Sequence, residues 1–550
     1  MREQTEGNPA GRRRLPRGGA LAWAALACVG LVLYLQAVPD NPPGFFADES
    51  SIAYNAHLVA RRGTDEHGAR FPLFFRAFGE YKSPVYVYLL AALFKITGPS
   101  IAVARSLSAV LGAAAALLLG LVAARSVRAR APAAGGRDAG TRGGEPADGA
   151  ARGDGTHEGV GHDTRGGVDA RRASLARAVG LTVALSALLT PWLFEISRLV
   201  FEVALMPLAL ALLLLALRAA HERGRWSLAD GVRVALALAL VTYTYSVGRL
   251  LAPLLALGLL LFARRAGWRR VALRTWLLYA ATLLPLVVFA LKDPGALGER
   301  FAQVSFVRAG MSWPEIALRF LQNYAGSFSP WGWLVAGDPE PRHHVQALGS
   351  LLAATVVAAG VGLFVVLRRR RRDPWWQFVV YGLLVSPLPA SLTADHFHTL
   401  RLVGLPVFLL VLAAPAFAWL FERGRRAPAR RAALAALVAL TLLQGALFLR
   451  QFHEAGPRRW HNFDAFYPEV FAAATARPHR PVYLIDNAGA PGYIHAYWYA
   501  TLAGMDTREF VRLPKERRPP PGALVISSEL PCTDCRIILE RASFRAYLAE

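Results

Sequence analysis

The sequence predicts a polytopic α-helical membrane protein with a small α/β domain at its C-terminus. Its 550 residues are 54% hydrophobic and 18% charged, with a mean hydropathy of +0.32. A soluble chain of this size carries about one quarter charged residues. Apolar runs of about 20 residues, the length of a helix that crosses a bilayer, recur along the chain. These observations place most of the chain in a membrane.

The charged residues indicate how the chain crosses that membrane. Clusters of arginine occupy alternate gaps between the apolar runs, as the positive-inside rule requires of cytoplasmic loops. The tail 1–18 is then cytoplasmic and, because the number of crossings is odd, the C-terminus lies outside. The net charge of +24 is thus a topology signal and indicates no nucleic-acid partner. About eleven runs have the length of a span: 19–38, 101–123, 175–194, 200–219, 229–243, 249–263, 272–291, 346–367, 375–392, 400–420 and 431–449.

This topology divides the chain into a transmembrane domain, 19–450, and an outer C-terminal domain, 451–550. Two long segments of the transmembrane domain, 39–100 and 292–345, fall on the outer face. The segment 124–173 is rich in Gly, Ala, Arg and Asp and has almost no large apolar residue. Because such a composition cannot bury a core, we predict a disordered cytoplasmic insertion there.

The first outer loop contains two short apolar stretches, 47–63 and 83–98, that are too short to cross the membrane. Counting either as a span would reverse every later loop and break the arginine pattern. We therefore expect two helices that lie on the outer surface, with Tyr86 and Tyr88 at headgroup depth.

The C-terminal domain has the pattern of a small α/β fold. The segments 482–486 and 523–528 are short apolar runs bounded by Pro, Gly and Asn, which is typical of buried strands. Cys532 and Cys535 form a C-x-x-C pair. A zinc site needs more ligands than this pair supplies, so a local disulfide in an oxidising compartment is the better interpretation.

Acids, cations and aromatic residues collect in the segments assigned to the outer face. A carboxylate beside the hydrocarbon is unfavourable and tends to mark function, and a carboxylate can deprotonate a hydroxyl. Cations at an interface suit a phosphate, while aromatic rings suit a sugar or a lipid chain. The pattern indicates a reaction on a phosphate-linked lipid. Asp48 is the catalytic candidate, and the expected substrate-binding residues are Glu49, Lys82, Arg198, Tyr245, Arg249, Asp338, Arg342, His343, His398 and Arg401.

Simpler interpretations stay open for several of these residues. Arg249, alone in a short turn, could extend to the membrane surface without a ligand. Glu195 and Glu202 could be solvated loop residues. No residue is assigned as a metal ligand, and no cofactor is assigned. Four histidines on two outer loops could nevertheless bind a divalent metal, and phosphate contacts explain them equally well: His343, His344, His396 and His398.

Several of these stretches resemble one family of membrane enzymes. They are GFFADESSIAYNAH, GEYKSPVYVY, ISRLVFEVAL, TYTYSVGRLLAPL, GDPEPRHH and HTLRLVGLP. Together these stretches resemble bacterial glycosyltransferase family 39. Relatives of this family in the GT-C superfamily include the protein O-mannosyltransferases and the lipid A aminoarabinose transferase. The similarity covers most of 19–450, and the C-terminal domain has no comparable match.

The resemblance implies a specific reaction. Such enzymes move a sugar from a polyprenyl-phosphate carrier to a lipid, glycan or protein acceptor, on the outer face of the bacterial cytoplasmic membrane. Asp48 would be the general base of an inverting displacement. Lys82, Arg342 and Arg401 would neutralise the departing phosphate. One departure is that the family commonly has Lys-Pro-Pro where this chain has Lys82-Ser83-Pro84.

Two other classes of function compete with a glycosyltransferase. A transporter or flippase of a lipid-linked sugar would use the same cations, but such proteins typically show internal repeats and broken helices, and the sequence shows no repeat. A membrane scaffold that only presents the C-terminal domain would leave the acids and cations on one face unexplained.

Overall fold

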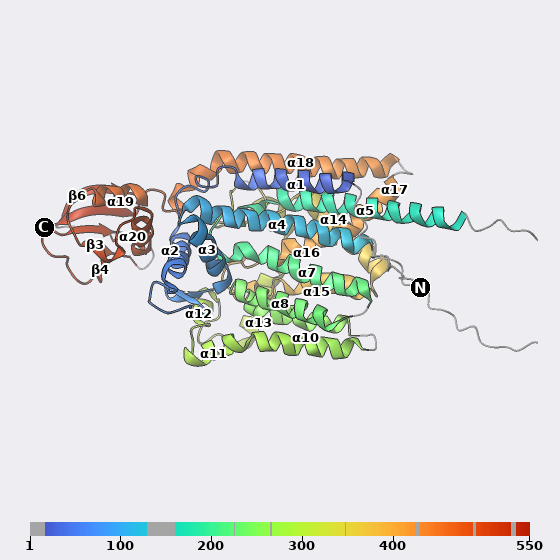
Figure 1. Cartoon of the computed structure of the whole chain (residues 1–550), viewed down its shortest axis with the longest axis horizontal. Coiled ribbons are helices and arrows are strands. Elements are labelled where there is room, and N and C mark those ends of the chain that lie inside the picture. The colour runs from blue at the N-terminus through green and yellow to red at the C-terminus, as the bar shows by residue number, and fades with distance from the viewer. Residues whose placement is uncertain are drawn as a thin grey trace, which may run out of the picture.

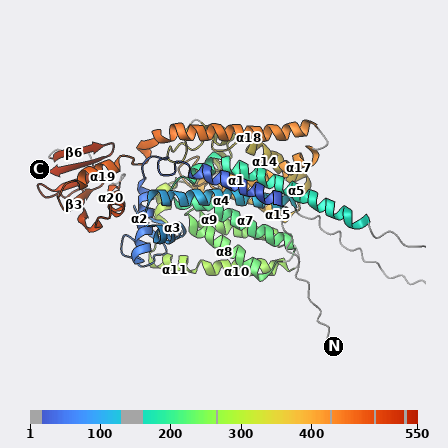
Figure 2. The same cartoon turned by 45° about the horizontal axis from the view of Figure 1, so that its top comes forward.

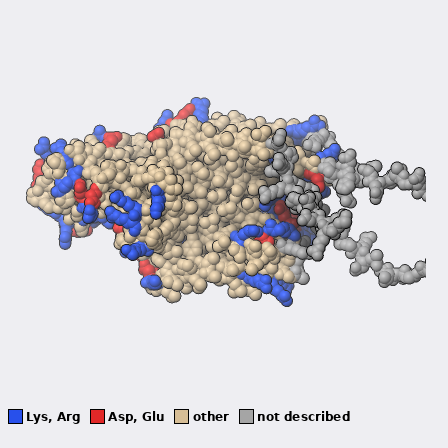
Figure 3. All heavy atoms as spheres, in the orientation of Figure 1, with Lys and Arg blue, Asp and Glu red and all other residues tan. Residues whose placement is uncertain are grey.

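The computed structural model describes residues 17–128, 160–224, 226–263, 267–346, 348–424, 428–487, 491–529 and 535–550. The molecule is elongated, with a bundle of helices along its length and the C-terminal sheet at one end (Figure 1). On the face shown in Figure 3, Lys, Arg, Asp and Glu gather at the two ends and leave the middle nearly free of charge. An uncharged belt of this kind suits the hydrocarbon core of a bilayer.

The predicted polytopic helical fold is confirmed. Among the described residues, seven helical stretches are long and apolar enough to cross a membrane. The remaining predicted runs form shorter helices, so the count of eleven spans stays a prediction. The seven stretches are Gly18–Leu35, Ile101–Arg128, Val168–Leu189, Glu202–Arg223, Trp268–Lys292, Gly404–Phe421 and Pro428–Asn462.

The bundle is built around α4, which packs against α1, α5 and α7. Paired glycines let α4 and α5 approach closely, because a Cβ on Gly120 would lie 2.5 Å from the carbonyl oxygen of Gly180. The bundle helices are α1 (Arg17–Leu35), α4 (Ile101–Arg128), α5 (Val160–Leu189), α7 (Met206–Arg223), α8 (Leu228–Thr244), α9 (Gly248–Leu257), α10 (Trp268–Thr282), α11 (Leu284–Lys292), α14 (Ala353–Val365), α15 (Pro374–Val385), α16 (Gly404–Leu412), α17 (Ala414–Gly424) and α18 (Pro428–Ala455).

The predicted surface helices exist as α2 (Ala47–Arg62) and α3 (Pro84–Thr97). They lie between the bundle and the C-terminal domain (Figures 1 and 2). A hairpin of β1 (Phe75–Ala77) and β2 (Glu80–Lys82), which the sequence analysis did not predict, joins them. The placement of Tyr86 at headgroup depth was wrong, because this side chain is fully buried and its hydroxyl lies 2.5 Å from Ser108 Oγ.

The prediction of disorder throughout 124–173 was wrong at both ends. Helix α4 continues to Arg128 and α5 begins at Val160, so helix extends into this segment from both sides. The central part, 129–159, lies outside the described residues.

Short helices lie between the spans. Helix α6 (Pro191–Ile196) is buried, whereas α12 (Glu299–Val304) and α13 (Trp313–Gly326) belong to the segment 292–345 that is predicted to be outside. Helix α13 exposes Trp313, Leu318 and Leu321, as expected of an amphipathic helix at a membrane surface.

The C-terminal domain is a mixed sheet of order β4-β3-β5-β7-β6. Its strands β3 (Val482–Ile485) and β5 (Leu524–Ser527) confirm the two predicted strands. Helix α18 continues to Ala455, so the domain begins later than residue 451. Cys535 is disulfide-bonded, and Cys532 lies outside the described residues. The other elements are α19 (Tyr467–Thr475), α20 (Gly492–Leu502), β4 (Phe510–Arg512), β6 (Cys535–Arg541) and β7 (Phe544–Ala549).

Reporter fusions test the topology. The ends of α4 and α5 that flank 129–159 lie at the end of the bundle opposite the C-terminal domain (Figure 1). We therefore expect a reporter placed within 129–159 to be cytoplasmic and one placed after Glu550 to be external. A third fusion between α9 and α10 should match the first, because arginines flank it. Finding the first two reporters on the same side would contradict the topology.

Candidate active site

The acidic stretch of the first outer loop forms the first turn of α2. Asp48 and Glu49 lie in that turn and Arg61 and Arg62 in the last one, a distribution that the helix dipole favours. The Glu49 side chain also accepts a hydrogen bond from the Phe46 amide at 3.0 Å. This turn therefore has a defined start, and Asp48 projects from it.

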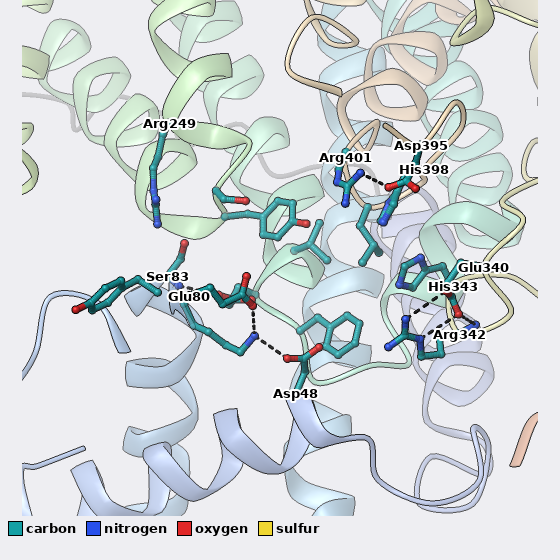
Figure 4. A pocket seen from close by; sticks show the side chains of 18 of the residues that line it. Asp48, Glu80, Ser83, Arg249, Glu340, Arg342, His343, Asp395, His398 and Arg401 are labelled. Atoms are coloured by element: carbon teal, nitrogen blue, oxygen red, sulfur yellow. Dashed lines mark hydrogen bonds and ion pairs between the residues drawn. The ribbon is translucent and has the colours of Figure 1, made fainter. Parts of the chain in front are cut away.

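A polar cavity of about 260 Å³ lies beside this turn (Figure 4). The structure brings eight of the predicted residues to its wall and leaves Glu49, Arg198 and Asp338 outside it. The lining residues are Asp48, Glu80, Tyr81, Lys82, Ser83, Phe201, Glu202, Val203, Tyr245, Ser246, Arg249, Ala296, Glu340, Arg342, His343, Asp395, His398, Leu400 and Arg401.

The β1–β2 hairpin places Lys82 against Asp48. Its turn residues Phe78 and Gly79 have φ values of 54° and 74°, as a tight two-residue turn requires. Lys82 Nζ lies 2.7 Å from Asp48 Oδ1 and 2.9 Å from Glu80 Oε1. Burial alone would lower the pKa of Lys82, but the nearby carboxylates raise it above its ordinary value, so this side chain stays charged.

Four carboxylates of the cavity were not among the predicted site residues: Glu80, Glu202, Glu340 and Asp395. Glu80 lies two positions from Lys82, so the alternation of a strand, which puts such residues on one face, could have revealed it. Glu202 is buried and accepts a hydrogen bond from the Ser83 amide at 2.7 Å. No sequence pattern indicates this contact, because the two residues are 119 positions apart.

Arg249 differs from the other cations of the cavity. Its Nε and Nη2 atoms are buried and have no hydrogen-bond partner among the described residues. The guanidinium lies 4.7 Å from the centre of the Phe74 ring. In Figure 4 it stands across the cavity from Arg342 and Arg401. Since a buried unpaired donor is unfavourable, this geometry favours an anionic ligand at Arg249.

Arg342 and Arg401 already have carboxylate partners. Arg342 Nε lies 3.0 Å from Glu340 Oε1, and Arg401 forms an ion pair with Asp395. The Arg342 guanidinium also lies 4.5 Å from the centre of the Phe46 ring, directly before α2. These two cations therefore offer less free charge to a ligand than Arg249 does.

Among the described residues, Asp338, His343 and His398 form the group that could hold a metal ion, with ligand atoms within 4.8 Å of one another. Burial, with Arg401 and His343 nearby, lowers the pKa of His398 to about 3, so its ring is neutral, as a metal ligand must be. His343 Nδ1 lies 3.5 Å from Asp338 Oδ2, and His398 Nδ1 has no hydrogen-bond partner among the described residues. These features fit a divalent metal without requiring one.

The other two histidines named as metal candidates are separated from this group. His344 Nδ1 lies 2.7 Å from Glu195 Oε2, and His396 Nδ1 lies 2.9 Å from Asn323 Oδ1. Asp338 lies behind the cavity wall, where its Oδ2 accepts hydrogen bonds from the amide and hydroxyl of Thr399 at 2.7 and 2.6 Å. It thereby fixes the loop that carries His398 and Arg401.

Glu49 and Arg198 lie outside the cavity, contrary to the prediction that they bind substrate. Glu49 is fully buried, and its two carboxylate oxygens accept hydrogen bonds from Arg105 Nη2 and Nε at 2.8 and 3.0 Å. Arg198 donates to the backbone carbonyls of Tyr34, Gln36, Ala37 and Asn41. Both side chains hold the connection between α1 and α2, so neither is available to a ligand.

The fold and the cavity together define a polytopic helical membrane protein with a charged site at the end of the bundle next to α2. Two similar solved structures are those of ArnT from Cupriavidus metallidurans. The one bound to undecaprenyl phosphate matches with a TM-score of 0.57 and 14% identity, over 97% of this chain and 98% of ArnT. The apo structure gives a TM-score of 0.55 and 14% identity, over 96% and 98%. No protein-family profile and no curated protein sequence matches the chain.

Replacing Glu49 tests its structural role. In Glu49→Gln the buried Arg105 loses its carboxylate partner, and breaking a buried ion pair in this way costs about 3–5 kcal/mol. We expect a lower thermal unfolding midpoint for the purified protein in detergent. Glu516→Gln, at an exposed position, is the control and should leave the midpoint unchanged. If Glu49→Gln left the unfolding midpoint unchanged and weakened ligand binding, Glu49 would be a binding residue instead.

Proposed function

We propose that this protein is a membrane glycosyltransferase that transfers a sugar from a polyprenyl-phosphate donor to a hydroxyl or other nucleophile of an acceptor. One observation carries the proposal: a single cavity holds a carboxylate, Asp48, and a guanidinium, Arg249, whose buried Nε and Nη2 have no hydrogen-bond partner among the described residues. A displacement at a glycosyl phosphate needs both a base and a site for the phosphate. The similar fold of ArnT, solved with undecaprenyl phosphate, supports the donor class.

Arg249 would bind the donor phosphate. Its guanidinium can present two donors to one phosphate group, a geometry that lysine lacks. Lys82, 6% exposed and already in contact with two carboxylates, would add positive charge between the phosphate and the base. Arg342 and Arg401 would complete the far wall, where their carboxylate partners reduce the field that they exert on an anion.

Asp48 would act as the base. The acceptor oxygen attacks the anomeric carbon while its proton passes to the Asp48 carboxylate, and the bond from that carbon to the phosphate oxygen breaks. The bond's electron pair leaves with the polyprenyl phosphate, whose negative charge is stabilised by Arg249 and Lys82. A single displacement of this kind inverts the anomeric configuration. The site would lie at the outer face of a bacterial cytoplasmic membrane.

Asp48→Asn tests the base. The amide keeps the size of the side chain but cannot take up the proton, so we expect transfer to fall by about 10²–10⁴-fold. Donor binding should remain measurable. The assay follows free polyprenyl phosphate released from a labelled donor, which also distinguishes an enzyme from a transporter, since a transporter releases none. Asp40→Asn, an exposed carboxylate of the same loop, is the control. Near-normal release by Asp48→Asn would reject the role of Asp48.

Arg249→Ala tests the phosphate site. Hydrogen bonds to charged groups contribute about 1.5–3 kcal/mol, so the Kd of polyprenyl phosphate should rise by about 10- to 100-fold. Arg249→Lys should recover only part of this affinity, because one ammonium cannot replace a forked guanidinium. Arg342→Ala and Arg401→Ala should weaken binding less than Arg249→Ala. The reverse order would place the phosphate on the opposite wall of the cavity.

A further inference from the structure

Three consecutive residues of α2 point toward three different parts of the molecule. Asp48 faces the cavity, Glu49 pairs with Arg105 of α4, and Ser50 meets the C-terminal domain. Successive residues of a helix project about 100° apart, so one turn can reach all three. The first two contacts belong to the site and its support. The third links the site to a domain to which the proposed reaction gives no role.

Ser50 is part of a buried hydrogen-bonded chain. Its hydroxyl oxygen lies 2.9 Å from His495 Nδ1, and His495 Nε2 lies 3.1 Å from Asp464 Oδ2. Ser50 and His495 are 0% and 1% exposed. Because an ionised carboxylate can only accept, His495 Nε2 donates to Asp464. With the proton on Nε2, Nδ1 accepts from the Ser50 hydroxyl at 2.9 Å; this is the shorter of the two contacts of that hydroxyl, since the Phe45 carbonyl oxygen lies 3.4 Å from Ser50 Oγ. The chain thus connects the first turn of α2 to helix α20 and to the segment before α19.

The order Ser-His-Asp resembles that of a hydrolase triad, but the geometry excludes this role. In a catalytic triad the serine contacts Nε2 and the aspartate contacts Nδ1, whereas here the two nitrogens are exchanged. Ser50 is also fully buried, and the Tyr467 ring lies 4.8 Å from the His495 ring. No acyl group can reach the hydroxyl, so the chain has a structural role.

Further contacts show that α20 docks along α2. The Trp498 ring stacks on Phe45, directly before α2, with ring centres 5.7 Å apart. The Tyr497 ring lies 5.5 Å from that of Tyr54, farther along α2. The Ser50–His495 bond is a polar contact of this interface two positions from Asp48, and a directional hydrogen bond restrains the helix turn where ring packing alone would allow sliding. The first turn of α2 is therefore held by Arg105 of the bundle and by His495 of the C-terminal domain.

We infer that the C-terminal domain positions Asp48 for catalysis through the Ser50–His495–Asp464 chain. The inference rests on the proposed role of Asp48. His495 is a positioning residue in this arrangement, since it touches α2 and not the cavity. A displacement of about 1 Å at a reacting group can reduce a rate by up to about a hundredfold, so a single hydrogen bond in the supporting turn has a measurable effect.

Substitutions that separate the two bonds of His495 test the inference. Ser50→Ala and His495→Gln remove the bond to α2, while the longer glutamine amide can still reach Asp464. His495→Asn keeps a polar atom near the Nδ1 position and can still contact Ser50. We expect kcat to fall by about tenfold in Ser50→Ala and His495→Gln, with the donor KM unchanged. His495→Asn should retain more of the wild-type kcat, and the double variant Ser50→Ala/His495→Gln should be no slower than the slower single variant.

Hydrogen exchange provides a readout that does not depend on activity. Peptides covering 45–57 should exchange faster in Ser50→Ala and His495→Gln, and peptides from the bundle should not change. Thr507→Ala is the matched control, because it removes the hydroxyl that contacts Tyr54 farther along the same interface, at 3.5 Å. It should leave kcat unchanged.

Unchanged kcat and exchange in Ser50→Ala would overturn the inference. So would a uniform rise in exchange across the protein, or a loss of kcat that His495→Asn shares with His495→Gln. Failure of the proposed function gives a different result: local exchange would rise as expected while Asp48→Asn transferred sugar normally.

Discussion

The ion pair between Arg105 and Glu49 is the contact on which the site depends. Both side chains are fully buried. Two charges taken out of water are stable only if nearly every polar atom is satisfied. Arg105 meets this requirement by donating to Glu49 and to the backbone carbonyls of Pro39, Pro42 and Gly44. It therefore fixes both the loop that enters α2 and the first turn of that helix. With Glu49 held toward the bundle, Asp48 can only face the cavity and Ser50 the C-terminal domain.

The cavity has an asymmetric distribution of charge. On one wall Arg342 and Arg401 are neutralised by acidic neighbours, and beside them Asp338 fixes the loop of His398. On the other wall Arg249 keeps two buried donors that have no partner among the described residues. Lys82 joins the two halves through its contact with Asp48. An anion entering this space gains most at Arg249, which would orient a glycosyl phosphate with its sugar toward the base.

Among the described residues, none from the C-terminal domain lines the cavity. The domain nevertheless contacts α2, the helix that carries Asp48. Helix α20 packs against α2 through aromatic rings and His495. The C-terminal domain and the bundle therefore both contact the first turn of α2, the former through His495 and the latter through Arg105. The loop ends of helices are the least restrained parts of a bundle. Under the proposed function, the domain would therefore add rigidity next to Asp48, where a small displacement matters most.

The sequence by itself determined the membrane-spanning architecture, the two surface helices, the two strands of the C-terminal domain and eight of the nineteen residues that line the cavity. These features depend on local properties, namely hydropathy over about 20 residues and charge between runs. The tertiary structure decided which side chains meet. Glu49 and Asp48 look alike in the sequence, but Glu49 pairs with Arg105, 56 positions away. Arg198 donates its hydrogen bonds to backbone carbonyls more than 150 positions away. Arg249 looks like an ordinary interfacial cation until the absence of a partner among the described residues becomes visible. Contacts between distant segments depend on how helices pack, and periodicity and composition carry no information about that packing.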